Sequence, residues 1–121
     1  MTDSTEEKLK SYLVSKGMQP LPINGSFEGR PNLSFQDGNG SRIFVKIASR
    51  DELEDRNAIL SLVLRSVSFR QTANKVYLAL PKIYASIVDG AIIQGEGLGL
   101  ITYDEKTIEE VIAPKYEDQA S

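Results

Sequence analysis

The run Val76–Leu80 constrains the fold of this chain more than any other segment. It reads Val-Tyr-Leu-Ala-Leu without a polar residue and is closed by Pro81. A strand with one face in water alternates apolar and polar residues, whereas a continuous apolar strand is buried on both faces. We therefore predict a strand over residues 76–80, in a central and parallel position of a sheet that is covered on both sides.

A β-hairpin is predicted ahead of this strand, over residues 33–48. Its first arm alternates apolar and polar residues, and its second arm, from residue 42 to 48, is rich in β-branched and aromatic side chains. The Asp-Gly-Asn-Gly stretch at 37–40 supplies the turn, because Gly and Asn tolerate positive φ. Pro20 and Pro22 allow only a short or edge strand near residues 21–23.

Helices are predicted on both sides of this hairpin. Ser4 and Glu7 form a capping box for a helix over residues 4–16, and Ser49 and Glu52 form another for a long helix ending near residue 70. The apolar positions at helical spacing in the long helix are Leu53, Ile59, Leu60, Val63, Leu64 and Val67. A short helix is predicted over residues 83–88, extending as far as residue 92.

The C-terminal part is predicted to form a second hairpin, with strands over residues 98–103 and 107–112. Pro114 ends the fold, and residues 115–121 form a tail. A hairpin followed by a helix and a buried strand requires a crossover connection, which places helices on a mixed sheet. We expect one α/β domain over residues 1–114, a central mixed β-sheet flanked by helices.

Composition excludes several classes of function. The 121 residues include no cysteine and no histidine, which excludes Ser-His and Cys-His nucleophiles and ordinary zinc sites. The net charge is −3, without the basic footprint of a typical nucleic-acid-binding domain. The apolar runs are too short to cross a membrane, and the acidic, polar first ten residues are unlike a signal peptide. We expect a cytoplasmic protein that has no contact with membranes.

Four sequence segments, taken in their order along the chain, resemble the PD-(D/E)XK nuclease superfamily. This superfamily includes the archaeal Holliday-junction resolvases. The segments are residues 29–35, 38–49, 75–81 and 97–104, and the resemblance spans residues 4–114. It implies a restriction-endonuclease-like fold. The family requires an acid after the proline of the first hairpin strand, and an acid and a lysine separated by one residue on the returning strand. These acids hold Mg²⁺, which activates water.

The motif is broken in this chain. Asn32 follows Pro31 in place of the first acid, Lys46 stands at the second acid position, and Ala48 stands at the lysine position. If the register shifts so that Lys46 is the motif lysine, the acid position falls on Phe44. The resemblance therefore implies a nuclease fold without its catalytic metal site, no catalytic residue and no cofactor.

Five residues on or beside the first hairpin are the candidate phosphate contacts: Arg30, Asn32, Arg42, Lys46 and Arg50. Lys46 would replace the charge of the missing metal; alternatively, it lies at a sheet edge and its ammonium group reaches water. Arg56 and Arg65 are interpreted mainly as helix-surface partners of the acids near Glu52.

These observations lead to three alternative hypotheses for the function. The first is an accessory nucleic-acid-binding protein in DNA repair or recombination, which binds DNA or a DNA-processing protein. The second is a protein-interaction or scaffolding module without nucleic acid, marked by an exposed apolar patch. The third is an active Mg²⁺-dependent nuclease with relocated acids such as Glu28 or Asp37. The resemblance also implies a homodimer.

Overall fold

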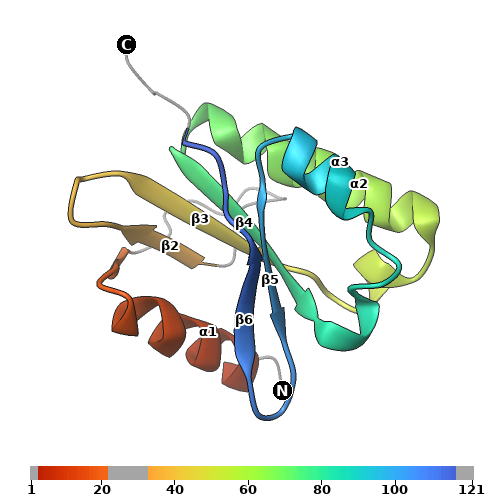
Figure 1. The fold of residues 1–121 in the computed structure, drawn as a ribbon, viewed down its shortest axis with the longest axis horizontal. Helices are drawn as coiled ribbons and strands as arrows, with labels where there is room; N and C mark the ends of the chain where they lie inside the picture. Colours follow the sequence, from red (N-terminus) through yellow and green to blue (C-terminus); the bar gives the residue numbers. More distant parts are fainter. Residues whose placement is uncertain (1–2, 22–32, 117–121) are drawn as a thin grey trace.

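The protein is one α/β domain built on a six-stranded mixed sheet (Figure 1). The computed structural model describes residues 3–21 and 33–116. The strands are β1 (Gln19–Leu21), β2 (Leu33–Gln36), β3 (Arg42–Ile47), β4 (Lys75–Pro81), β5 (Gly99–Tyr103) and β6 (Ile108–Ile112). The helices are α1 (Asp3–Ser15), α2 (Arg56–Ser68) and α3 (Gly90–Gly95), with 3-10 turns η1 (Asp51–Leu53), η2 (Phe69–Gln71) and η3 (Lys82–Tyr84). The predicted α/β class and mixed sheet are confirmed.

The order of strands in the sheet is the order of strands in the chain, β1 to β6. β3, β4 and β5 run parallel, and β1–β2, β2–β3 and β5–β6 are antiparallel pairs. The strand predicted from the apolar run is therefore parallel to both of its neighbours, and its residues from Val76 to Leu80 are all buried. Pro20 lies in β1, at an edge of the sheet, where a missing N–H group is tolerated.

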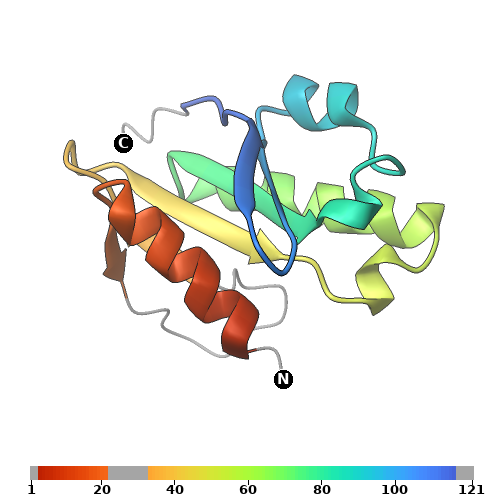
Figure 2. The same ribbon diagram turned by 60° about the horizontal axis from the view of Figure 1, so that its bottom comes forward.

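Each face of the sheet carries its own core. α1 covers one face, where Leu9 and Leu13 are fully buried against Phe35, Ile101 and their neighbours. α2 and α3 lie on the opposite face, over a core that includes Leu62, Leu78 and Ile93 (Figure 2). Both connections between parallel strands run on the α2 side, so α1 is the helix that covers the other face.

The long helix predicted over residues 49–70 is interrupted. The reciprocal hydrogen bonds of the Ser49–Glu52 capping box form, but they lie at the turn that contains η1 and not at the start of α2. Asp55 then adopts an extended conformation, with φ −149° and ψ 176°, and its side chain accepts a hydrogen bond from the Ala58 amide. α2 therefore begins at Arg56, because Asp55 is an independent N-cap.

The predicted apolar stripe faces the core in part: Leu53 and Val63 are buried, and Ile59 and Val67 pack against the core. Leu60 and Leu64 are 48% and 60% exposed, whereas Leu62, Val63 and Ser66 are buried. Apolar residues at helical spacing occur on two overlapping faces of this helix, and the packing against β4 selects the second. The helix predicted over residues 83–88 is likewise replaced by η3, and α3 starts only after its cap, Asp89. Lys115, predicted to lie in the tail, donates its amide to the Gly97 carbonyl.

Thr102 is a buried polar residue in β5. Its side chain is buried, with 2% of the residue exposed, and its hydroxyl has no hydrogen-bond partner among the described residues. An unsatisfied buried hydroxyl costs about 1 kcal/mol or more, so we expect Thr102→Val to stabilise the protein by about 1 kcal/mol in urea unfolding. Thr107→Val is the matched control, because Thr107 donates its hydroxyl to Asp104 and its loss should destabilise. A destabilised Thr102→Val variant would mean that this hydroxyl has a partner in solution.

Candidate functional site

An ion-pair network occupies the position on β3 where the nuclease resemblance places an acid. Lys46 lies near the end of β3, and alternation along the strand turns it toward the α2 side, with Phe44. Its Nζ lies 3.3 Å from Oε2 of Glu52, and Nη1 of Arg65 lies 2.9 Å from the same oxygen. The side chain of Lys46 is only 12% exposed. β3 is flanked by β2 and β4, so the prediction of an edge lysine that reaches water is wrong.

The second carboxylate oxygen of Glu52, Oε1, is hydrogen-bonded as well. The Ser49 amide donates to Oε1 at 2.9 Å, and the Glu52 amide donates to the Ser49 hydroxyl at 3.3 Å. Burial acts to raise the pKa of the Glu52 carboxyl group, but the Ser49 amide and the charge of Lys46 outweigh it, so the pKa is lowered from its ordinary value of 4.5. The carboxylate is therefore the stable form at neutral pH.

This lowered pKa predicts how stability depends on pH. A carboxyl group whose pKa is lower in the folded than in the unfolded protein adds stability above the unfolded value, and that stability is lost as the pH falls through the folded value. We expect Glu52→Gln to lose about 1 kcal/mol at pH 7 relative to the native chain, and the difference to shrink below pH 4.5. Urea unfolding at pH 7 and pH 3 measures it, with exposed Glu54→Gln as the control. A difference that is constant with pH would contradict the charged network.

The other predicted phosphate contacts do not gather around Lys46. Arg42 lies at the opposite end of β3, about 13 Å away along the strand, and it is exposed. Arg50 is exposed and precedes η1. Arg30 and Asn32 lie outside the described residues. The described part of the hairpin therefore provides one sheltered lysine and two separated arginines.

The geometry offers little to a metal ion. Over residues 3–21 and 33–116, no group of three or more acids lies close enough together to hold one. Asp37, a relocated acid under the third hypothesis, accepts hydrogen bonds from the amides of Asn39 and Ser41 and so shapes the hairpin turn. Glu28 lies outside the described residues. Glu52 faces two cations, which compete with a metal for its oxygens.

The ion pair between Lys46 and Glu52 was not predicted from the sequence. Glu52 was assigned to a capping box, which is correct but describes only one of its oxygens. Arg65 was expected to pair with the acids near Glu52, and it does contact Glu52, but across 13 residues rather than at the spacing of one helical turn. The break at Asp55 folds η1 back beside α2, and no local spacing in the sequence signals that contact.

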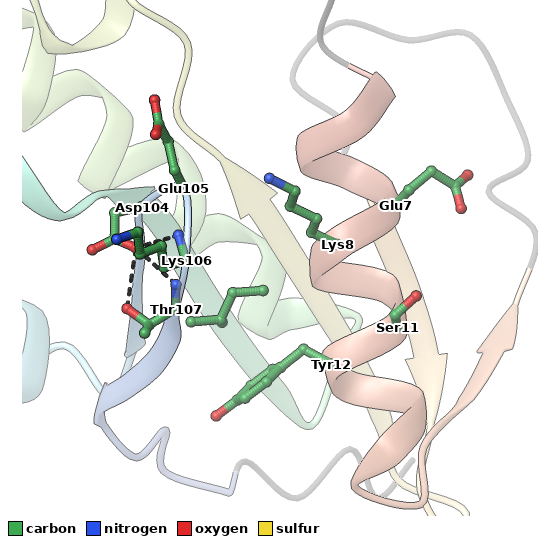
Figure 3. Close-up of a pocket in the computed structure, with 9 residues that line it drawn as sticks. Glu7, Lys8, Ser11, Tyr12, Asp104, Glu105, Lys106 and Thr107 are labelled. Carbon is green, nitrogen blue, oxygen red and sulfur yellow. Dashed lines mark hydrogen bonds between the residues drawn. The ribbon is translucent and has the colours of Figure 1, made fainter.

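A hollow lies on the α1 side of the sheet, at the carboxyl ends of β4 and β5. It is a groove of about 610 Å³ between α1 and the β5–β6 turn, with an adjoining pocket of about 250 Å³. Figure 3 shows Lys8 and Tyr12 pointing from α1 toward the turn, while Glu7 points away. The turn residues that line it are Asp104, Glu105, Lys106, Thr107 and Ile108.

This groove carries charges of both signs on its walls. Asp104 is engaged by its own turn, since one of its oxygens accepts from the amides of Lys106 and Thr107, and these hydrogen bonds lower its pKa. Burial raises the pKa of Tyr103, which lines the adjoining pocket, so its phenol stays protonated at neutral pH. The groove and the Lys46 network lie on opposite faces of the sheet and are separate sites.

The described residues form a single α/β domain with a six-stranded mixed sheet and a partly exposed ion-pair cluster on the α2 side of the sheet. No known family model and no curated protein matches the chain. A solved structure, a protein of unknown function, SPO1766, from Silicibacter pomeroyi, is similar in fold. Its TM-score is 0.63 at 14% identity, and the match covers 89% of this chain and 67% of that one. No helix among the described residues is long and apolar enough to span a membrane.

Proposed function

We propose that this chain is a catalytically inactive, nuclease-like domain that binds nucleic acid as an accessory protein in DNA repair or recombination. The observation that carries the proposal is Lys46, a sheltered cation at the position where the resemblance requires a metal-binding acid. Its charge is balanced by Glu52, and a lysine at this position attracts a phosphate without activating water. We propose the cytoplasm as its location, since the proposed partner is available there.

The topology supports the resemblance on which the proposal depends. A first helix, an antiparallel meander of β1 to β3, the helix α2 and a parallel β4 follow one another in the chain. This is the order that the restriction-endonuclease-like fold implies, and that assignment remains a proposal. The net charge of −3 argues for local rather than general attraction of nucleic acid.

Binding and cleavage assays in the same tubes test this function. Labelled junction, duplex and single-stranded DNA are titrated with the protein across a range of salt, with and without Mg²⁺ or Mn²⁺. We expect binding that weakens as salt rises and no cleavage. Lys46→Ala should weaken binding several-fold, whereas Lys106→Ala, which removes an exposed lysine on the far side of the sheet, should not. Metal-dependent cleavage would overturn the proposal in favour of an active nuclease with relocated acids.

Self-association is a second candidate function, and the exposed face of α2 favours it. Leu60 and Leu64 lie one turn apart on this face, 48% and 60% exposed, and the neutral Ser61 lies beside them. A two-fold axis through this face would bring the same leucines of two copies together. Sedimentation tests it: a homodimer that Leu64→Glu converts to monomer supports this function, and a monomeric native chain contradicts it.

A further inference from the structure

The donors that surround the Glu52 carboxylate come from three separate segments. Lys46 projects from β3, Arg65 projects from α2, and the Ser49 amide belongs to the connection that follows β3. Together they place two cations and one N–H group on the two oxygens of a single carboxylate. This is the donor set that proteins use for phosphate and carboxylate groups, because charged donors form the stronger hydrogen bonds to oxyanions.

The donors and the acceptor differ in how firmly the fold holds them. Lys46 is anchored in a strand with partners on both sides, and Arg65 in a regular helix. Glu52 belongs to the three-residue turn η1, and its side chain is 18% exposed. The side chain of Arg65 is 45% exposed, so the cluster opens to solvent on the α2 side. Glu52 is thus the one side chain of the cluster that is carried by a short turn rather than by a regular strand or helix.

We propose that Lys46, Arg65 and the Ser49 amide form an oxyanion site, which Glu52 fills in the free protein and vacates when a phosphoryl group binds. Glu52 is an internal competitor: attached through a short stretch of chain, it acts at an effective concentration of about millimolar or higher. A single free phosphate therefore binds weakly, whereas a ligand with several phosphates can displace the carboxylate. This inference deepens the proposed function, and its meaning for nucleic acid rests on that function.

Removing the competitor provides the test. Inorganic phosphate is titrated into the native chain and into Glu52→Ala, with the Ser49 amide resonance as the reporter of binding. We expect Glu52→Ala to bind phosphate at least tenfold more tightly than the native chain, and the double variant Lys46→Ala/Glu52→Ala to lose this gain. Glu54→Ala is the matched control, because it removes the same charge from an exposed neighbour and should change the affinity less than twofold.

Further arms separate the ligand sources and keep the inference falsifiable. Acetate replaces phosphate to measure a simple carboxylate, and a short single-stranded oligonucleotide measures a phosphodiester; we expect the oligonucleotide to bind most tightly. If Glu52→Ala does not fold, Glu52→Gln removes the charge while retaining the shape. Equal phosphate affinity in Glu52→Ala and Glu54→Ala would overturn the inference, even if the native chain binds DNA elsewhere. Tighter phosphate binding by Glu52→Ala, with no DNA binding by any variant, would support the oxyanion site and contradict the proposed function.

Discussion

Gly99→Ala is expected to lower the free energy of unfolding by about 3 kcal/mol. Gly99 lies in β5 opposite Tyr77 of β4. A β-carbon at this position would lie 2.7 Å from Cδ1 of Tyr77 and 2.8 Å from Cδ of Pro114. The Tyr77 ring cannot swing away freely, because it is buried and its hydroxyl donates to Glu110 at 2.8 Å. The added methyl group must therefore shift the backbone of two strands.

Gly95→Ala is the matched control for this prediction. A β-carbon at Gly95, at the end of α3, meets nothing within 4 Å, so we expect the free energy of unfolding to change by less than about 1 kcal/mol. Urea unfolding measures both variants. A double variant with Tyr77→Leu should recover part of the loss at Gly99, since the two residues are in contact. Equal losses at Gly95 and Gly99 would show that the aromatic ring does not select glycine here.

Leu13→Ala is expected to have an effect of similar size, about 3 kcal/mol. Leu13 and Leu9 are the two side chains of α1 that are fully buried among the described residues, and they pack against Phe35, Ile101 and neighbouring residues. Truncating Leu13 leaves a cavity between the helix and the sheet. Because few large side chains anchor α1, its amide protons should also exchange faster in this variant.

Val14→Ala is the control for α1, because Val14 is adjacent in the chain but 44% exposed. We expect it to change the free energy of unfolding by about 0.5 kcal/mol or less. Urea unfolding combined with hydrogen exchange distinguishes the two variants. If Leu13→Ala matched Val14→Ala, α1 would not be packed on the sheet in solution as described above.

The sheet was predictable because its signals are local and strong. The continuous apolar run of β4 required burial on both faces, and the Asp-Gly-Asn-Gly turn fixed the hairpin of β2 and β3. Pro20 correctly indicated an edge strand, with a shift of two residues. These features depend on neighbours in the sequence or on the period of two along a strand, so they can be read without knowing what packs against them.

The helical segment and the site were less predictable for a physical reason. α2 has apolar residues on two faces, and only the tertiary packing decides that Val63 is buried and Leu64 exposed. Glu52 satisfies a local capping rule, which conceals its contacts with Lys46 and Arg65. These contacts depend on the break at Asp55, because Asp55 caps α2 in place of Ser49. Local rules give equal support to the alternatives at such positions.

The coincidence of strand order in the sheet and in the chain has a consequence for synthesis on the ribosome. Each strand from β2 to β6 pairs with the strand made immediately before it, so no strand has to insert between two that are already paired. Each new strand can therefore pair with a strand that has already been made, and only the connection between consecutive strands has to close. The assembly that must wait is the docking of α1 against Ile101 of β5. The first helix to be made is thus the last to be locked in place.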